Sequence, residues 1–210
     1  MKNKLSKRLF TIINLIDKNS IVLDVGTDHG HIPIFLVQNN LTNKAYGSDI
    51  SENAITNLQQ RIKKLDLENN ITIFHNDGIK SINVKYDTLI LAGMGYHTIK
   101  HIISDELLPK NIIIQSNSKL KEVRKLLKSL NYKIVTEKVI YENQKYYSIL
   151  KYEKGKENLS YFHLNFGKSN NKDYYKHLIK HYNNLMKKVP FKIKLKYIKN
   201  IILLQFKIIL

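Results

Sequence analysis

Short apolar segments alternate with amphipathic segments from about residue 20 to residue 130, and this alternation constrains the fold more than any other feature of the chain. Segments with strand character lie at residues 20–26, 45–50, 71–74, 86–92 and 112–115. Helical segments lie between them, at residues 32–37, 51–65, 97–107 and 120–129. The alternation predicts an α/β fold with a parallel, doubly wound sheet whose ligand loops meet at the carboxyl edge of the strands. The third and fourth strands are apolar enough to be covered on both faces.

Segments on both sides of this pattern extend the same unit. Residues 4–18 place apolar side chains at helical spacing, with Ser6 and Arg8 on the polar side, and predict an amphipathic helix. Residues 133–139 and 146–152 predict a closing pair of strands.

The pattern changes after residue 153, which predicts a second, helical domain. Residues 172–189 and the segment after Pro190 each carry a helical apolar stripe. Because proline interrupts a helix, we expect an antiparallel hairpin of two helices. The predicted domains are residues 1–153 and residues 154–210.

Positive charge is concentrated in this second part. The chain holds 35 Lys and Arg residues against 17 Asp and Glu residues, a net charge of +18. Residues 1–150 carry 21 cations and 14 anions, whereas residues 151–210 carry 14 cations and only 3 anions. Lysines interleaved with aromatic residues favour a partner that is a polyanion, such as RNA. The alternative is a solvated lysine surface over an aromatic core.

Several classes of site and location are disfavoured by what the sequence lacks. It has no cysteine, which excludes disulfides, thiolate metal sites and cysteine nucleophiles. His29 and His31 lie two residues apart, but no further ligand converges with them by spacing, so we expect no metal. With no secretion signal and no apolar stretch long enough to span a bilayer, we expect a soluble cytoplasmic protein that does not bind membranes. We also expect a monomer.

A glycine turn follows the first predicted strand, in the segment Asp24-Val-Gly-Thr-Asp-His-Gly-His31. Gly26 allows a sharp turn and the close approach of a ligand. The dinucleotide fingerprint G-x-G-x-x-G needs a second glycine where Asp28 stands, and that carboxylate would repel a pyrophosphate. A cofactor with a positive centre and no phosphate tolerates the acid, and S-adenosylmethionine has this chemistry.

Polar and small residues end the next three predicted strands. Asp49, followed by Ile50, ends the second strand about 20 residues beyond the turn, where an acid accepts the ribose hydroxyl protons. Asp77 and Gly78 follow the third strand, where they can bind the adenine ring. The fourth ends in Ala92-Gly93-Met94-Gly95, which lets a flat base or a methyl donor lie against the chain. In this order the residues predict a cofactor site.

Three motifs give the sequence a resemblance to a known family. The block Asp24-Val-Gly-Thr-Asp-His-Gly-His-Ile-Pro33, then Ala92-Gly-Met-Gly95, then Gln115-Ser-Asn117 resembles the TrmK family, the bacterial tRNA (adenine-22-N1)-methyltransferases. The resemblance covers about residues 5–150, including the opening Leu5-Ser-Lys-Arg-Leu9. It implies a Rossmann-like class I methyltransferase domain followed by a coiled-coil-like helical part. It also implies methylation of N1 of adenosine 22 in the tRNA D-arm region by S-adenosylmethionine.

The resemblance also assigns site residues. It makes Asp28 the catalytic carboxylate, with His29, Gln115 and Asn117 near the target base. The expected cofactor-binding residues are Asp24, Gly26, Thr27, Asp49, Ile50, Asp77, Gly78, Ala92, Gly93 and Met94. Gly95 is also expected near the substrate. The positive charge, and not the resemblance, adds Lys7, Arg8, Lys176, Lys180, Lys187 and Lys188 as expected tRNA-binding residues. Tyr96 and Ser116 depart from the family pattern, in which glycine and proline stand there.

A mechanism follows for Asp28. Adenine N1 has a free lone pair, so its methylation needs no base at that atom and leaves a cationic ring. A carboxylate that accepts a hydrogen bond from the N6 amine would stabilise this charge. The alternative is that Asp28 only caps the helix that begins near Ile32.

Other activities stay open. The nearest alternative is a methyltransferase for another RNA or a protein, although the Asn/Asp-Pro-Pro-Tyr/Phe motif of exocyclic-amine methylation is absent after the fourth strand. An RNA-binding protein without activity is a further alternative, disfavoured by the acids at positions 28 and 49. An NAD-dependent oxidoreductase is disfavoured by Asp28 in the glycine turn and by the lack of a plausible hydride-transfer dyad.

Overall fold

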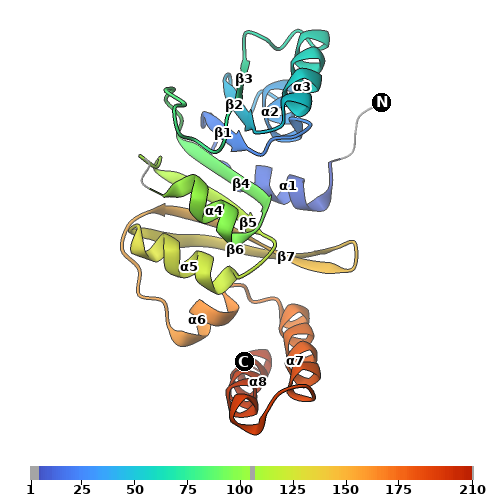
Figure 1. Ribbon diagram of the computed structural model, residues 1–210, viewed down its shortest axis with the longest axis vertical. Helices are drawn as coiled ribbons and strands as arrows, with labels where there is room; N and C mark the ends of the chain where they lie inside the picture. The colour runs from blue at the N-terminus through green and yellow to red at the C-terminus, as the bar shows by residue number, and fades with distance from the viewer. Residues whose placement is uncertain (1–4, 105–106, 210) are drawn as a thin grey trace. The chain divides into compact units, whose positions relative to one another are not determined.

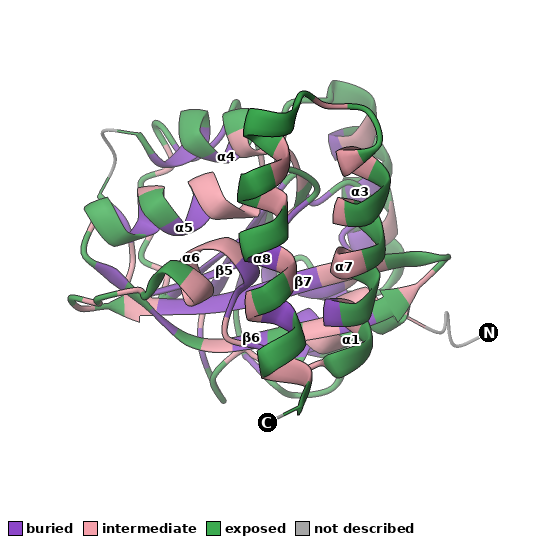
Figure 2. Cartoon of the chain, turned by 90° about the horizontal axis from the view of Figure 1, so that it is seen from below, coloured by how far each residue is buried: buried purple, intermediate pink, exposed green. Residues whose placement is uncertain are grey.

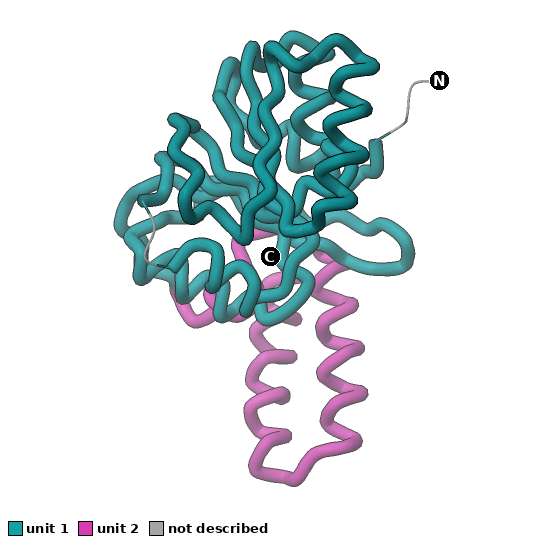
Figure 3. The backbone as a smooth tube through the Cα atoms, turned by 45° about the horizontal axis from the view of Figure 1, so that its top comes forward, with its two compact units in different colours: residues 1–159 teal, residues 160–210 magenta. Residues whose placement is uncertain are grey.

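The computed structural model describes residues 5–104 and 107–209. The chain forms two compact units, residues 1–159 and residues 160–210, shown in teal and magenta in Figure 3. The change of unit falls six residues beyond the boundary predicted from the sequence.

The first unit is built on a seven-stranded sheet with the order β3-β2-β1-β4-β5-β7-β6 (Figure 1). Its strands are β1 (Val22–Val25), β2 (Ala45–Asp49), β3 (Ile71–His75), β4 (Thr88–Met94), β5 (Asn111–Ser116), β6 (Tyr132–Glu142) and β7 (Lys145–Lys154). The first five strands are parallel, and β7 pairs antiparallel with both β5 and β6. The predicted doubly wound sheet with a closing strand pair is confirmed.

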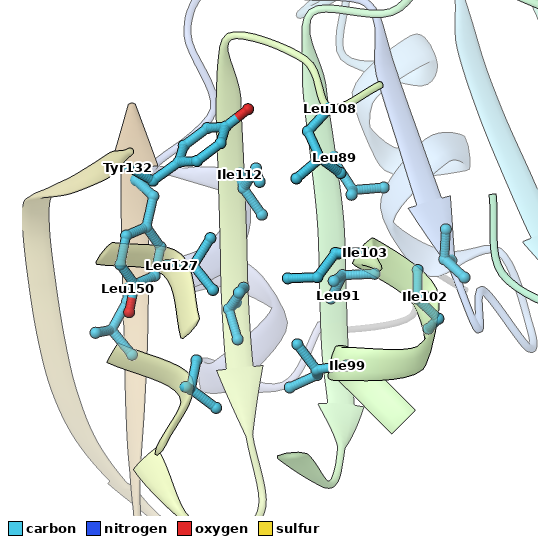
Figure 4. Packing of buried hydrophobic residues seen from close by; sticks show 14 of the residues in the cluster. Leu89, Leu91, Ile99, Ile102, Ile103, Leu108, Ile112, Leu127, Tyr132 and Leu150 are labelled. Atoms are coloured by element: carbon cyan, nitrogen blue, oxygen red, sulfur yellow. The ribbon is translucent and has the colours of Figure 1, made fainter. Parts of the chain in front are cut away.

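Helices cover both faces of this sheet. They are α1 (Lys7–Ile13), α2 (His31–Gln38), α3 (Glu52–Lys64), α4 (Tyr96–Ile103) and α5 (Leu120–Ser129). Because side chains alternate along a strand, Leu89 and Leu91 pack into the cluster beneath α4 and α5, whereas Ile90 packs into the cluster beneath α1, α2 and α3. Figure 4 shows the first cluster, in which Ile99 and Ile103 of α4 face the strands. Two apolar clusters therefore hold the sheet between two helical layers.

The α5 layer also contains a buried ion pair. The Arg124 Nη2 atom lies 2.6 Å from the Glu137 Oε1 atom on β6, and both side chains are almost completely buried. In Figure 2, α5 turns its exposed residues outward and its buried residues toward the sheet. A buried charge needs a partner, so this pair fixes how α5 packs on β6.

Three element predictions differ from the structure. The predicted strand at 71–74 is not covered on both faces: β3 lies at the sheet edge, where Thr72 is exposed and Phe74 half-buried. The helix predicted over 4–18 ends at Ile13, because the N–H groups of Leu15 and Ile16 bond three residues back and tighten the turn. The helix predicted over 97–107 ends at Ile103, and residues 105–106 lie outside the described residues.

The second unit consists of α6 (Tyr161–Phe166), α7 (Lys172–Met186) and α8 (Phe191–Ile209). Helices α7 and α8 pack together as the predicted hairpin (Figure 3), whereas α6 was not predicted. Phe166, Tyr175 and Leu204 are buried together, with Phe162 and Tyr182 packed against them. Five aromatic residues thus form or pack against the core of this unit, whereas Tyr161, Phe191 and Phe206 are exposed.

Candidate functional site

The loop after β1 makes a tight turn at Gly26. Its φ angle is +70°, a conformation that favours glycine. The N–H groups of Gly26 and Thr27 both donate to the Ser48 carbonyl of β2, at 2.8 and 3.1 Å. A Cβ atom at Gly26 would lie 2.5 Å from the Met94 Cε atom at the end of β4. The turn therefore brings the ends of three strands together, and its positive φ angle, more than the flexible end of Met94, favours glycine there.

Asp24 lies beneath this turn with its carboxyl group buried. The Thr27 hydroxyl donates to its Oδ2 atom at 2.8 Å. Burial raises the pKa of Asp24 from 3.8 to about 7; the Thr27 hydrogen bond opposes this shift, and the nearby Asp49 charge adds to it. Asp24 thus helps to hold the turn in place through its hydrogen bond with Thr27.

We expect Asp24→Asn to stabilise the cofactor-free protein more at pH 8 than at pH 5. Because the folded-state pKa lies above the unfolded value, the folded protein binds the proton more tightly, and this contribution to stability is lost as pH rises through about 7. The advantage of the Asn variant over wild type should grow by about 2–3 kcal/mol between the two pH values. Urea unfolding at both pH values measures it; an equal difference at both would contradict the ionisation of a buried Asp24.

Asp28 lies at the exposed rim of the turn. Its φ angle is +48°, and its N–H donates to the Asp49 Oδ2 atom at 3.0 Å. Its side chain is 67% exposed, and its Oδ2 atom lies 3.4 Å from the His29 Nε2 atom. The N-cap of α2 is Gly30, and no side chain bonds the cap. Asp28 therefore does not cap α2. Its carboxylate is exposed, and its backbone N–H is bonded to Asp49.

His29 and His31 flank this carboxylate. Their ring centroids lie 5.6 Å apart in an edge-on arrangement. Burial lowers the pKa of His31, and the positive charge of Arg61 adds to the effect. Arg61 also donates to the His29 carbonyl at 2.9 Å, which fixes the loop to α3.

The ends of β2 and β3 present two more carboxylates. Asp49 accepts the Ser51 N–H at its Oδ1 atom at 3.0 Å, and Ile50 beside it is 66% exposed. Asp77 is exposed and lies 3.3 Å from the His101 Nε2 atom of α4. An exposed apolar side chain next to an acid can cover a flat ring while the acid binds a polar group of the same ligand.

Gly78 holds the loop after β3 in place. Its φ angle is +81°, and its carbonyl accepts hydrogen bonds from the Ser48 hydroxyl at 3.2 Å and the Asn76 amide at 3.1 Å. Ser48 is fully buried and thus bonds the loops after β1 and β3 at once. We did not predict that Ser48 connects these two loops. The feature of the sequence that could have indicated it is a serine within an apolar strand.

The loop after β4 is bonded to the end of β5. The Gly93 N–H donates to the Gln115 Oε1 atom at 3.1 Å, and the Asn117 side-chain amide donates to the Gly93 carbonyl at 2.6 Å. The Asn117 N–H donates to the Met94 carbonyl at 2.7 Å. Arg8 of α1 donates to the same Gln115 oxygen at 2.8 Å. The segment Ala92–Gly95 is therefore held between α1 and β5.

The two departures from the family pattern lie in this region. The Tyr96 N–H donates to the Ser118 hydroxyl at 3.3 Å. The Ser116 hydroxyl donates to the Ser118 carbonyl at 2.7 Å. Both residues thus take part in the turn that follows β5.

Most predicted site residues come together at one edge of the sheet. Contacts connect Asp24, Gly26, Thr27, Asp28, Asp49, Gly78, Gly93, Met94, Arg8, Gln115 and Asn117, directly or through Ser48. Lys7 lies on α1, where its N–H donates to the Glu142 carboxylate at 2.6 Å. Lys176, Lys180, Lys187 and Lys188 are exposed on the second unit.

The donor set fits S-adenosylmethionine. Carboxylates follow β1, β2 and β3, at Asp28, Asp49 and Asp77. Such groups accept protons from ribose hydroxyls and an adenine amine and attract a sulfonium and an ammonium, whereas they repel a pyrophosphate. The edge therefore suits a phosphate-free nucleoside with positive charge.

Residues 5–104 and 107–209 are the part of the chain that the structure describes. Within them, no three His, Asp or Glu side chains are grouped so that they could hold a metal ion. None of the helices described there is long and apolar enough to cross a membrane.

Known proteins resemble the chain in sequence. A family described as a methyltransferase domain matches residues 5–150. The tRNA (adenine(22)-N(1))-methyltransferase of Bacillus subtilis is 29% identical over 163 residues, which cover 75% of this chain and 68% of that protein. A Mycoplasma genitalium protein with the provisional name tRNA methyltransferase is 33% identical over 159 residues, covering 73% of this chain and 72% of its own.

One solved structure resembles the chain over almost its whole length. It is TrmK of M. capricolum in complex with S-adenosylhomocysteine, the product of its natural cofactor, with 29% identity and a TM-score of 0.85. The match covers 97% of both chains, so it includes the helical second unit.

Proposed function

Because the chain belongs to the methyltransferase-domain family and, within it, to the TrmK enzymes, we propose that it transfers a methyl group from S-adenosylmethionine to N1 of adenosine 22 in tRNA. One observation carries the proposal at the site: an exposed carboxylate, Asp28, stands in the glycine turn with its backbone bonded to a second carboxylate, Asp49. Asp49 suits a cofactor with ribose hydroxyls and no phosphate, and the Asp28 carboxylate suits a reaction that creates positive charge.

Three strand ends would hold the cofactor. Both oxygens of Asp49 accept a backbone N–H, and each retains a lone pair for a ribose hydroxyl. Asp77 would accept the adenine amine in place of His101, and Ile50 would cover the ring. Bound S-adenosylmethionine supplies an electrophilic methyl group on a sulfonium. The Gly93–Met94 segment is bonded to Gln115 and Asn117. Because Gly93 has no side chain, the methyl donor could lie against the backbone there.

Asp28 would act on the target base. Its carboxylate accepts a hydrogen bond from the adenine N6 amine, which increases the electron density at N1 and stabilises the cationic ring that forms. His29, 3.4 Å away, orients the carboxylate toward the rim. Since N1 lies on the Watson–Crick edge, the base must leave its pair before it can reach this residue.

The binding energy for unpairing would come from lysines that contact tRNA phosphates. Lys176, Lys180, Lys187 and Lys188 are exposed on α7 and just beyond it, and Lys7 is exposed on α1. The tRNA-binding role of residues 154–210, a cytoplasmic location and a monomeric state are parts of this proposal.

The proposal is tested with purified protein, S-adenosylmethionine and tRNA transcripts. We expect primer extension to stop at position 22, no stop when adenosine 22 is replaced by guanosine, and calorimetric binding of S-adenosylmethionine but not NAD. Total tRNA from a deletion strain should lack the same stop. A methyl group on another position, on ribosomal RNA or on protein alone would refute the proposal.

A further inference from the structure

Arg8 places a guanidinium beside the loop after β4. It extends from α1, half-buried, with its Nη1 atom 2.8 Å from the Gln115 Oε1 atom. Its guanidinium carbon lies 5.6 Å from the centroid of the Tyr147 ring. A Cβ atom on Gly93 would lie 3.6 Å from the same Nη1 atom. The cation is therefore adjacent to the segment where the cofactor and the target base would meet.

This cation has no acidic partner in the described part of the chain. The ion pairs found there involve other side chains, and the groups around Arg8 are an amide and a phenol ring. A guanidinium has five N–H donors, and Gln115 takes one of them. A bare cation beside a base that becomes positive would oppose methyl transfer, so the site needs an anion next to Arg8. Guanidinium binds phosphate oxygens with two parallel hydrogen bonds.

Hydrogen bonds to Gln115 hold the Arg8 guanidinium next to the loop after β4. It is fully buried, and its Oε1 atom accepts both from Arg8 and from the Gly93 N–H at 3.1 Å. Its Nε2 atom donates to the Asn117 Oδ1 atom at 2.9 Å. Since both ends of the amide already have partners, Gln115 connects Arg8 to the loop instead of reaching outward to a base.

We infer that Arg8 binds a backbone phosphate of the RNA next to the target adenosine, and that Gln115 is the positioning residue that fixes the guanidinium there. The inference rests on the proposed function and adds to it the chemical group that Arg8 recognises. It also gives Gln115 an indirect role in tRNA binding, through Arg8.

The test compares Arg8→Met, Gln115→Glu and the double variant with wild type, using tRNA and S-adenosylmethionine. Arg8→Met should raise the KM for tRNA about tenfold and reduce the slope of log affinity against log salt by about one. Gln115→Glu, which supplies a carboxylate that neutralises Arg8, should give a similar loss. The Kd for S-adenosylmethionine should stay within threefold. In the Arg8→Met background, Gln115→Glu should cost little more.

Lys18→Met is the matched control. Lys18 is an exposed cation shortly before β1, at the opposite end of that strand from the site, and its loss should leave the salt slope unchanged. Thermal unfolding checks each fold, and Arg8→Met carries the test if the buried Gln115 variant does not fold.

Three results would overturn the inference. An unchanged KM and salt slope in Arg8→Met would remove the phosphate contact while leaving the proposed function intact. A full additional loss in the double variant would show that Gln115 acts independently of Arg8. If wild-type protein does not methylate tRNA at all, the proposed function fails first, and the inference fails with it.

Discussion

Replacing Asp28 with Asn is expected to lower the turnover of tRNA methylation by about 10²- to 10³-fold, and by at least tenfold, because the developing positive charge loses its carboxylate. The Kd for S-adenosylmethionine should stay within a few-fold, since the backbone N–H of residue 28, not its side chain, bonds Asp49. Asn is nearly isosteric and tolerates the φ angle of +48° at this position. Single-turnover methylation and calorimetry measure the two quantities.

Asp66 offers a matched control for this substitution. It is an exposed aspartate just beyond α3, and its φ angle of +54° is close to that of Asp28. Asp66→Asn should leave turnover unchanged, which separates the loss of this carboxylate from the loss of any surface charge. Full activity in Asp28→Asn would remove Asp28 from the mechanism.

Neutralising four lysines of the second unit is expected to have the next largest effect. Changing Lys176, Lys180, Lys187 and Lys188 to Gln should weaken tRNA binding by about 100-fold at physiological salt and reduce the salt slope by about three. All four side chains are exposed and outside the aromatic core, so the helices should remain folded. Filter binding over a salt series gives both numbers, and cofactor affinity should not change.

The control replaces four exposed lysines of the first unit, Lys63, Lys64, Lys110 and Lys128, with Gln. The total charge changes equally, so a comparable loss of affinity would show that net charge, and not this hairpin surface, binds tRNA. Normal tRNA affinity in the variant that lacks Lys176, Lys180, Lys187 and Lys188 would contradict the proposed tRNA-binding role of the second unit.

The alternation of strand and helix segments alone predicted the parallel sheet, and the apolar runs of β4 and β5 fit it because helices cover both faces of these strands. It could not show that β3 is an edge strand, since strand order is set by tertiary pairing. It also missed α6, a short helix in a polar segment whose Phe166 is buried only by α7 and α8.

The site was predictable where its residues lie at the ends of consecutive parallel strands. Gly26, Asp28 and Asp49 follow consecutive parallel strands, so the glycine turn and the acid could be placed together. The contact between Arg8 and Gln115 joins residues 107 positions apart and depends on how α1 packs against the sheet, where it contacts β6 and β7. No spacing rule contains that information.

The sheet order has a consequence for synthesis on the ribosome. Strand β7 is translated last, yet it pairs with both β5 and β6 and lies between them. Strand β1 can form its second strand pairing only after β4 has been translated. A nascent polypeptide that stops before residue 145 therefore leaves the backbone N–H and C=O groups on one edge of β5 unpaired, and such an edge can pair with other chains until β7 emerges. The first unit acquires its native pairing only when nearly its whole length has been translated.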